Sequence, residues 1–594
     1  LIGFLVIRLN KKEQDYFKGG NRIPWVMSAM SLFIGSFTAY MFVGASGQAH
    51  KVGLACLLLY TSSFYGCVIV YLYAAAKWRR TRITSPTEYL EMRFGKSFRY
   101  FFSFIQIPIS ILGGGNLLFV LSIFISSALR FTGEFRILGI PLSGLELCII
   151  VTGFSTVLYT TAGGIWAVIL TDTVQFIIVM VMSVLLIPYC FIALGKGQLI
   201  QGVQQFLTQP PTPDYFHLIK PSQTLFFTIA WIFLMCLSFP GGLSVAQRLY
   251  TVPTEKDAKK TIALTGMFYL IIPLIWTLPV FVMRPFLNNL ATLWPQLKNP
   301  AEASYVTITL MLLPNGMIGL TVSAILAATM STVSVNYNIF SSIFIEDIYK
   351  PFIARKPESK YTLYASRICT FIYGILTMIM GIALARYGKG DAFKTTFTIS
   401  SHLSLVFALP FAIGLLFRRI PWWTPFISIP VCFATTLSLE FLWGPILGEL
   451  YPGSVFARIK ESAFPYTVFA SIGVNFIIYF VAFLLYNEND PINKKADHLF
   501  QLMKKPVSED PEASLFIPNL NTYRVVGKTL ALFGVCMILL FLSGLSHDPR
   551  KINLMAGLIF LVLFAIIQWL TSPRFSPFAL VRKQLRNEIN SFEK

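Results

Sequence analysis

The chain has 594 residues, of which 55% are hydrophobic and only 13% are charged. Soluble domains carry about 25% charged residues, so this composition excludes a soluble enzyme, a secreted disulfide scaffold and a disordered protein. It indicates a chain whose solvent is lipid. We assign the formal net charge of +21 to membrane topology instead of nucleic-acid binding, because no basic run lies within a polar module.

A membrane-spanning helix needs about 20 mostly apolar residues. We interpret residues 1–8 as the remainder of a truncated first helix. The runs that follow are continuously apolar, which predicts an all-α polytopic membrane protein. Fourteen complete spans are expected near residues 25–49, 53–77, 99–130, 138–161, 164–194, 223–247, 261–286, 316–345, 361–386, 391–417, 422–445, 464–487, 525–545 and 551–572.

The distribution of basic residues predicts the orientation of these spans. Alternate connections hold 33 Lys and Arg residues, among them Arg248, and the opposite connections hold 14. Because cytoplasmic loops carry the excess of basic residues, we expect the N-terminus outside and the C-terminus in the cytoplasm. The two longest connections, residues 287–315 and 488–524, then lie outside and inside, respectively.

Glycine and proline occur at matching places in two halves of the chain. The first complete span contains Gly35, Gly44 and Gly47, and the span five positions later contains residues 240–242, Pro-Gly-Gly. Interrupted helices at corresponding positions are typical of inverted-repeat transporters. The ordinary enrichment of glycine and proline in membrane helices explains the same residues equally well.

Asp172 is the most informative charged residue. It follows the start of its span by eight residues, about 12 Å at 1.5 Å per residue. A carboxylate at this depth faces a cavity, a cation or a partner, unless it is solvated at the cytoplasmic mouth. Glu146 and Glu440 are weaker candidates of the same kind.

A second polar cluster lies in the span near residues 316–345. Ala328, Ser331 and Thr332 are spaced i, i+3 and i+4, which places them on one helix face. Two hydroxyls and a backbone carbonyl there provide the oxygen ligands that hard cations prefer. The alternative is that small residues and hydroxyls mediate close helix packing.

Several strings in order along residues 8–420 resemble the sodium:solute symporter family. The segment from Tyr159 to Gln175 is the most similar to a family signature. The strings are YFKGG at 16–20 with Pro24-Trp25, SPTEYL at 85–90 with RFG at 93–95, YTTAGGIWAV at 159–168 with Thr171-Asp172 and Gln175, Gln247-Arg248, and EDIYK at 346–350.

This resemblance implies a LeuT-like core of two inverted five-helix repeats. These would occupy residues 25–194 and 223–417, with the truncated helix before them. Four C-terminal helices would follow within 422–572, interrupted by the cytoplasmic loop 488–524, and residues 573–594 would form a cytoplasmic tail. The implied function is symport of sodium with a small organic solute by alternating access.

The family's sodium site implies five ligands in this sequence. Backbone carbonyls of Ile34, Phe37 and Ala328 and the hydroxyls of Ser331 and Thr332 would bind Na⁺. Some members bind a second sodium ion, for which the resemblance implies Asp172 and Ser334 together with Ser331. Val335 stands where a further serine is expected, so we favour one ion. Gly35 would support the unwinding that frees the carbonyls.

The substrate positions depart from the galactose-type pattern. The side chains implied there are mainly aromatic or thioether, with Ser63 as the small polar group. Aromatic rings stack equally well on a sugar face and on an apolar ring. The implied residues are Tyr40, Met41, Tyr60, Ser63, Met235, Phe239, Phe397 and His402.

The long connection 488–524 resembles the sugar-transporting branch and favours a sugar or polyol. The alternatives are a proton-coupled carrier, a carrier of a carboxylate, amino acid or other non-sugar solute, and a transporter-like sensor. An enzyme is not expected, since no nucleophile and base are paired at membrane depth. The expected partners are sodium, a small molecule and the lipid bilayer of the cell membrane, without nucleic acid.

Overall fold

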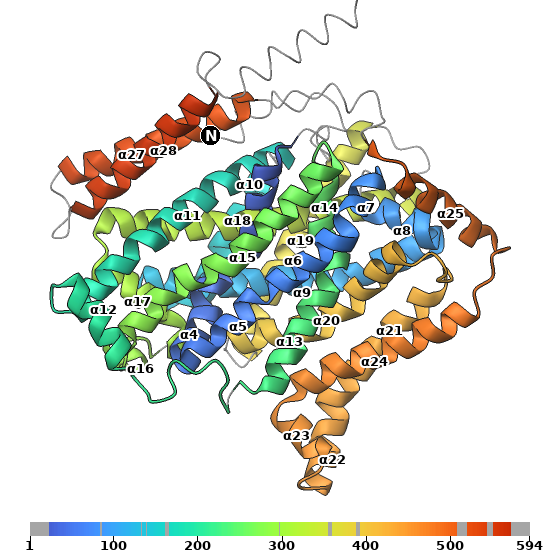
Figure 1. Cartoon of the computed structure of the whole chain (residues 1–594), viewed down its shortest axis with the longest axis horizontal. Coiled ribbons are helices and arrows are strands. Elements are labelled where there is room, and N and C mark those ends of the chain that lie inside the picture. The colour runs from blue at the N-terminus through green and yellow to red at the C-terminus, as the bar shows by residue number, and fades with distance from the viewer. Residues whose placement is uncertain are drawn as a thin grey trace, which may run out of the picture.

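A computed structural model describes residues 23–83, 86–131, 133–137, 139–160, 165–221, 223–295, 297–353, 359–387, 392–507, 520–542 and 551–571. Within these ranges, eleven helices are long and apolar enough to cross a membrane, or up to twelve if one bent pair forms a single span. The expected truncated helix at 1–8 and the tail at 573–594 lie outside the described residues. The structure is a bundle of long, mostly antiparallel helices (Figure 1).

The first part of the bundle is helical apart from one short hairpin. Its elements are α3 (Trp25–Ser36), η3 (Met41–Ala45), α4 (Ser46–Val52), η4 (Gly53–Ala55), α5 (Cys56–Thr61), α6 (Ser63–Ile69), η5 (Val70–Ala74), α7 (Ala75–Arg80), α8 (Pro86–Phe94), α9 (Lys96–Ala128), β1 (Glu134–Ile137), β2 (Ile140–Ser143), α10 (Gly144–Thr160), α11 (Ile165–Leu194) and α12 (Leu199–Thr208).

The middle part holds the second broken helix and several further long spans. Its elements are α13 (Leu225–Ser238), η6 (Phe239–Gly241), α14 (Leu243–Tyr250), α15 (Glu255–Met283), η7 (Arg284–Phe286), α16 (Leu290–Leu293), η8 (Pro300–Ala303), α17 (Ser304–Leu312), α18 (Asn315–Phe344), η9 (Ile345–Ile353), α19 (Ser359–Tyr387) and α20 (Ala392–Leu416).

The C-terminal part packs outside these helices. Its elements are α21 (Thr424–Leu437), η10 (Ser438–Trp443), α22 (Gly444–Leu450), α23 (Val455–Glu461), α24 (Ala463–Leu484), α25 (Pro491–Lys504), α27 (Leu520–Leu542) and α28 (Lys551–Thr571). Helices α27 and α28 pair with each other and contact α11, whereas α22 and α23 project from the bundle (Figure 1).

Two helices are interrupted, as the glycine and proline pattern predicts. Helix α3 ends at Ser36, Phe37 leaves the helical region with φ −97° and ψ 64°, and the chain resumes as η3. Gly35 itself stays helical, so the break falls slightly later than expected. The second break bends the chain by 45° between Leu225–Gly241 and Leu243–Tyr250.

Backbone contacts hold both breaks in place. After the first break, the amide of Ala39 donates to Thr329 Oγ1 of α18 over 2.9 Å. At the second break, a Cβ added to Gly241 would lie 1.8 Å from the carbonyl oxygen of Ala408 on α20. Only glycine permits this close approach of η6 to α20.

The span expected to begin near residue 138 begins at Gly144 instead. An antiparallel hairpin precedes it, in which Glu134 pairs with Ser143, and Gly139 adopts a φ of 82° in the turn. Glu146 then caps α10, because its carboxylate accepts from the Ser143 amide while its own amide donates to Ser143 Oγ. This reciprocal pairing is a capping box. Glu146, which also pairs with Arg386, therefore has a structural role.

The RFG string begins with an arginine that closes the end of a distant helix. Arg93 is fully buried, and its guanidinium donates to the carbonyls of Gly414, Phe417, Arg418 and Ile420. These carbonyls at the end of α20 have no intrahelical donors, and a cation is favourable there. Helix α8 thereby fixes the position of α20.

The connection 488–524 contains a helix that the sequence analysis missed. Asp490 caps α25 by accepting from the Ile492 amide over 2.8 Å, and Pro491 occupies the first turn. Aspartate followed by proline is a helix-start signal, but the same pair of residues is also typical of a turn. Helix α25 packs on α8 and α7.

Candidate ion and substrate site

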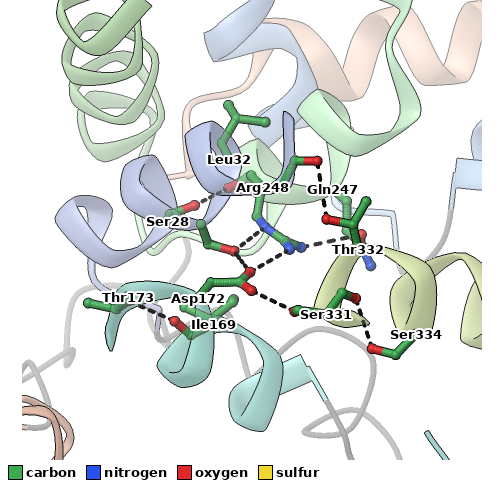
Figure 2. A network of polar contacts seen from close by, with 12 residues as sticks. Ser28, Leu32, Ile169, Asp172, Thr173, Gln247, Arg248, Ser331, Thr332 and Ser334 are labelled. Carbon is green, nitrogen blue, oxygen red and sulfur yellow. Dashed lines mark hydrogen bonds and ion pairs between the residues drawn. The ribbon is translucent and has the colours of Figure 1, made fainter. Parts of the chain in front are cut away.

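Asp172 is the centre of a buried polar network where four helical segments meet (Figure 2). It lies on α11 and is 3% exposed. Its Oδ2 accepts a hydrogen bond from Ser31 Oγ of α3 over 2.5 Å, and its Oδ1 accepts from Ser331 Oγ of α18 over 2.6 Å. Both carboxylate oxygens therefore have protein donors, and the carboxylate is not a solvated group at the cytoplasmic mouth.

Arg248 supplies the opposite charge from α14. Its Nε donates to Ser31 Oγ over 3.0 Å, and its Nη2 lies 3.7 Å from Asp172 Oδ2. Ser31 thus accepts from the guanidinium and donates to the carboxylate. The main chain is fixed as well, since the carbonyl of Arg248 accepts from Ser28 Oγ over 2.9 Å.

Arg248 is therefore not one of the cytoplasmic loop charges, contrary to the expectation from the charge distribution. The residue is 6% exposed and lies within α14, directly after the second break. A buried charge needs a paired counter-charge, and arginine is well suited to that role. The signal in the sequence was the adjacent polar pair Gln247-Arg248, which directly follows an interrupted span.

The hydroxyl face of α18 lies against the first break. Thr332 Oγ1 lies 3.4 Å from the carbonyl oxygen of Gly35 and 3.2 Å from that of Ala328. Gly35 was not among the five implied ligands. The carbonyl of Ile34 accepts from the amide of Phe37 over 3.0 Å, so the two residues are joined at the break.

The two serines of α18 that the resemblance implies for sodium binding have different partners. Ser331 Oγ is directed towards Asp172, as described above. Ser334 Oγ donates to the carbonyl of Ser331 over 2.8 Å within its own helix. Of the residues implied for a second sodium ion, Asp172 and Ser331 are in direct contact, while Ser334 bonds to the backbone of α18.

Several of the implied substrate residues lie around α5, α6 and the second break. Ser63 Oγ lies 3.6 Å from Met235 Sδ. A Cβ on Gly66 would lie 2.9 Å from Phe239 Cβ, which shows how closely α6 approaches η6. Met41 begins η3 directly after the first break.

Two aromatic residues of α15 join this group and were missed. The Trp276 ring packs edge-on against Tyr60 at 5.4 Å, and Tyr269 packs against Phe239 at 5.7 Å. Tyr40 lies near the buried Tyr60 hydroxyl. Nothing in the pattern of α15, which is mostly apolar after its charged first turns, distinguishes these rings from ordinary core residues.

The two remaining substrate candidates are on α20. The side chain of Phe397 lies outside the described residues. His402 is buried, and its Nε2 lies 2.8 Å from Glu440 Oε2 of η10. The structure therefore pairs His402 with the first helix after α20.

Broken membrane helices that surround a buried charged network define a secondary transporter. The fold agrees with this class. The chain is similar to the solved structure of a Na⁺-coupled sialic acid symporter in a substrate-bound outward-open state, with a TM-score of 0.63 and 20% identity over 82% of this chain and 94% of that one. The fold is therefore LeuT-like, as expected.

The family follows from the sequence match. The model of the sodium:solute symporter family matches residues 16–421, which is more than half of the chain, so the protein belongs to this family. It is a multi-pass membrane transporter that moves a solute with sodium, and it is not an enzyme.

Two curated relatives share about a quarter of their aligned residues with this chain. The chain is 24% identical over 402 residues to the sodium/sialic acid symporter SiaT of Proteus mirabilis (strain HI4320), covering 66% of this chain and 78% of that protein. It is 25% identical over 455 residues to the sodium/myo-inositol cotransporter 2 of Oryctolagus cuniculus, covering 68% of this chain and 62% of that protein.

A double-mutant cycle tests the buried pair. We expect Asp172→Asn and Arg248→Gln each to lower the free energy of unfolding by ~3–5 kcal/mol, because each leaves an uncompensated buried charge. The double variant should lose less than the sum of the two. Chemical denaturation in detergent measures all three.

Arg418→Gln is the matched control. It breaks the exposed pair with Asp497, for which the expected loss is below ~1 kcal/mol. Losses at Asp172 and Arg248 no larger than this control value would show that the buried pair does not hold the four segments together.

Proposed function

We propose that this protein couples inward sodium flow to the uptake of a small sugar or polyol by alternating access. The contact between Thr332 and the carbonyls of Gly35 and Ala328 is the single observation that carries the proposal. It supports a cation site between α18 and the broken α3, the two elements that the family resemblance implies.

The proposed sodium ligands are oxygens at this contact. The hydroxyls of Ser331 and Thr332 and the carbonyls of Ala328, Ile34 and Phe37 are the implied set, and the carbonyl of Gly35 is a further candidate. Hydroxyl and carbonyl oxygens suit a hard cation such as Na⁺. The break at Phe37 makes backbone oxygens available to a cation, while the surrounding protein shields these oxygens from lipid.

The position of Arg248 supports the proposal that the protein binds one sodium ion and not two. Its guanidinium already neutralises Asp172, and Ser31 and Ser331 already donate to both carboxylate oxygens. A second sodium at Asp172 would have to compete with this built-in cation. We therefore propose that the network is a fixed ionic joint beside the transported ion.

The proposed substrate site lies where α5, α6, α15 and η6 meet. Tyr60, Phe239 and Trp276 offer ring faces, while Ser63 offers a hydrogen-bonding group. Rings stack on the apolar face of a sugar or cyclic polyol. The names of the two relatives, which refer to sialic acid and myo-inositol, support a polyhydroxylated solute.

The proposed topology follows the charge distribution and the breaks. The first repeat would occupy residues 25–194 and the second 223–417, so that α3 and α13–α14 are corresponding broken helices. The N-terminus would lie outside and the C-terminus in the cytoplasm. Arg93, α8 and α25 would then be on the cytoplasmic face.

A variant of α18 tests the sodium site. Thr332→Ala removes one oxygen, and we expect the sodium concentration for half-maximal uptake to rise about tenfold, the equivalent of ~1.4 kcal/mol. Thr321→Ala is the control, because Thr321 Oγ1 bonds only to the Met317 carbonyl of the same helix in the described contacts. Equal sodium dependence in the two variants would remove Thr332 from the site.

Uptake into proteoliposomes tests the substrate class. We expect sodium-dependent uptake of myo-inositol or of sialic acid, and Ser63→Ala should raise the solute concentration for half-maximal uptake several-fold, because it removes a hydrogen bond of about 0.5–1.5 kcal/mol. The sodium dependence should stay as in the parent protein.

Thr61→Ala is the control for the substrate site, since Thr61 Oγ1 bonds to the Leu57 carbonyl in its own helix. A solute that is transported with unchanged half-saturation in Ser63→Ala, or uptake restricted to amino acids or carboxylates, would contradict the proposed site or substrate class, respectively.

A further inference from the structure

The first half of α25 is tied to the end of α20. Asp490 Oδ2 accepts a hydrogen bond from Trp422 Nε1 over 2.9 Å. Asp497 accepts from Arg418 through both carboxylate oxygens, at 2.6 and 2.9 Å. Trp422 and Arg418 belong to residues 417–423, which connect α20 to α21. Two side chains of α25 therefore fix it to the segment that leaves α20.

The same half of α25 packs on α8. A Cβ added to Gly95, which follows α8 with a φ of 89°, would lie 3.3 Å from Ile492 Cγ2 of α25. The guanidinium of Arg93 lies 5.5 Å from the centre of the Phe500 ring. Because Arg93 also binds the carbonyls at the end of α20, the helices α8, α20 and α25 are joined in one place.

The other end of α25 is held by two arginines at the end of α7. Arg80 Nη1 donates to the carbonyl of Met503 over 3.3 Å. Arg82 donates to the carbonyl of Leu502 over 3.2 Å and to that of Pro506 over 3.4 Å. The last carbonyls of a helix have no donors within the helix, and a cation is favourable beside them. The two guanidinium groups therefore complete the end of α25.

Glu255 connects this end of α25 to α15. Its two carboxylate oxygens accept from Arg80 at 2.8 and 3.2 Å, and Oε1 also accepts from the amide of Val507 over 2.8 Å. Val507 lies just beyond α25 and is 1% exposed. We call the contacts of Arg80, Arg82 and Glu255 with residues 502–507 the clasp.

The two ends of α25 are attached to different groups of helices. The first group holds both breaks, since α15 packs on α3, α6 and α7, and α14 packs on α3 and α7. In the second group, α9, α10, α18 and α19 pack on one another, and α8 packs on α9. The clasp attaches α25 to the first group, and α8 attaches it to the second. Figure 1 shows α25 at the end of the bundle where α7 and α8 lie.

We propose that α25 is a strap that limits how far the two groups of helices separate at this end of the bundle. The proposal rests on the proposed alternating access, in which one group of helices rocks against another around the bound solute. Because α25 is attached to both groups, their ends separate there only when one attachment is released. The clasp is the attachment that releases, since α25 packs more extensively on α8 than on α7.

Double electron–electron resonance on the purified full-length protein measures the strap without a transport assay. Spin labels coupled to a genetically encoded keto amino acid avoid the native cysteines. Labels at the exposed Lys504 of α25 and Lys256 of α15 give a clasp distance. Labels at the exposed Lys96 of α9 and at Lys256 give a group distance, because α9 and α15 belong to different groups.

The test variant combines Arg80→Gln with Arg82→Asn, which removes both guanidinium groups of the clasp. Asparagine suits the φ of 55° at residue 82. We expect the clasp distance to lengthen. We also expect the fraction of molecules with a longer group distance to rise several-fold, because hydrogen bonds from charged donors that favour the joined state are lost. Arg82→Asn alone keeps the pair of Arg80 with Glu255 and should act in the same direction if the double variant does not fold.

Lys460→Gln is the matched control. It breaks the exposed pair with Glu449 between α23 and α22, and both distances should stay as in the parent protein. The same lengthening in this control would indicate a general loosening of the protein and would overturn the proposal.

Two further outcomes would overturn the strap. An unchanged clasp distance in the arginine variant would show that the guanidinium groups do not hold the end of α25. A longer clasp distance with an unchanged group distance would show that α25 does not restrain the two groups. Sodium-dependent uptake alongside either result would leave the proposed function standing, whereas loss of the proposed function would show as absent uptake in the parent protein.

Discussion

The structure depends on the need to balance one buried negative charge. Asp172 lies in a membrane helix where an uncompensated carboxylate would be costly, and its partners come from three other segments: Ser31 of α3, Ser331 of α18 and Arg248 of α14. These segments are separated by many residues in sequence. The carboxylate therefore fixes both broken helices relative to α11 and α18.

In the proposed mechanism the two breaks can serve as binding sites because the contacts of Asp172 hold the adjoining helices in place. A helix that leaves its regular path in a membrane frees backbone oxygens, which is tolerated only where protein or a polar cavity surrounds them. The first break is docked through Ala39 and Thr329, and the second through the contact of Gly241 with Ala408. In the proposed mechanism, the sodium ion binds at the first break and the solute lies near the second.

Much of this arrangement could be predicted from the sequence, and the reasons are physical. Long apolar runs specify membrane helices, and Asp172 and the Ser331–Thr332 face are conspicuous because polar groups are rare there. The interrupted spans were located within a few residues, although Gly35 remains helical. The strings quoted above were sufficient to identify the family, which the family match confirms.

Other features depend on tertiary contacts that sequence patterns do not encode. The sequence does not distinguish Arg248 from an arginine in a loop, and only the fold shows that Arg248 faces Asp172. Trp276 and Tyr269 are hidden among apolar neighbours. Glu440 and His402 were considered separately, as a membrane-depth carboxylate and a substrate residue, because the pairing of α20 with η10 is a matter of packing. Helix α25 was missed because its start signal, Asp490-Pro491, is also a turn signal.

The central claim is that Arg248 acts as a permanent counter-ion of Asp172, so that the protein binds one sodium ion. Equilibrium binding of ²²Na⁺ to the purified full-length protein, counted per chain at saturation, tests this claim most directly. The account predicts one ion per chain. Two ions per chain would contradict it, because a second sodium would then bind despite the guanidinium that already neutralises the carboxylate.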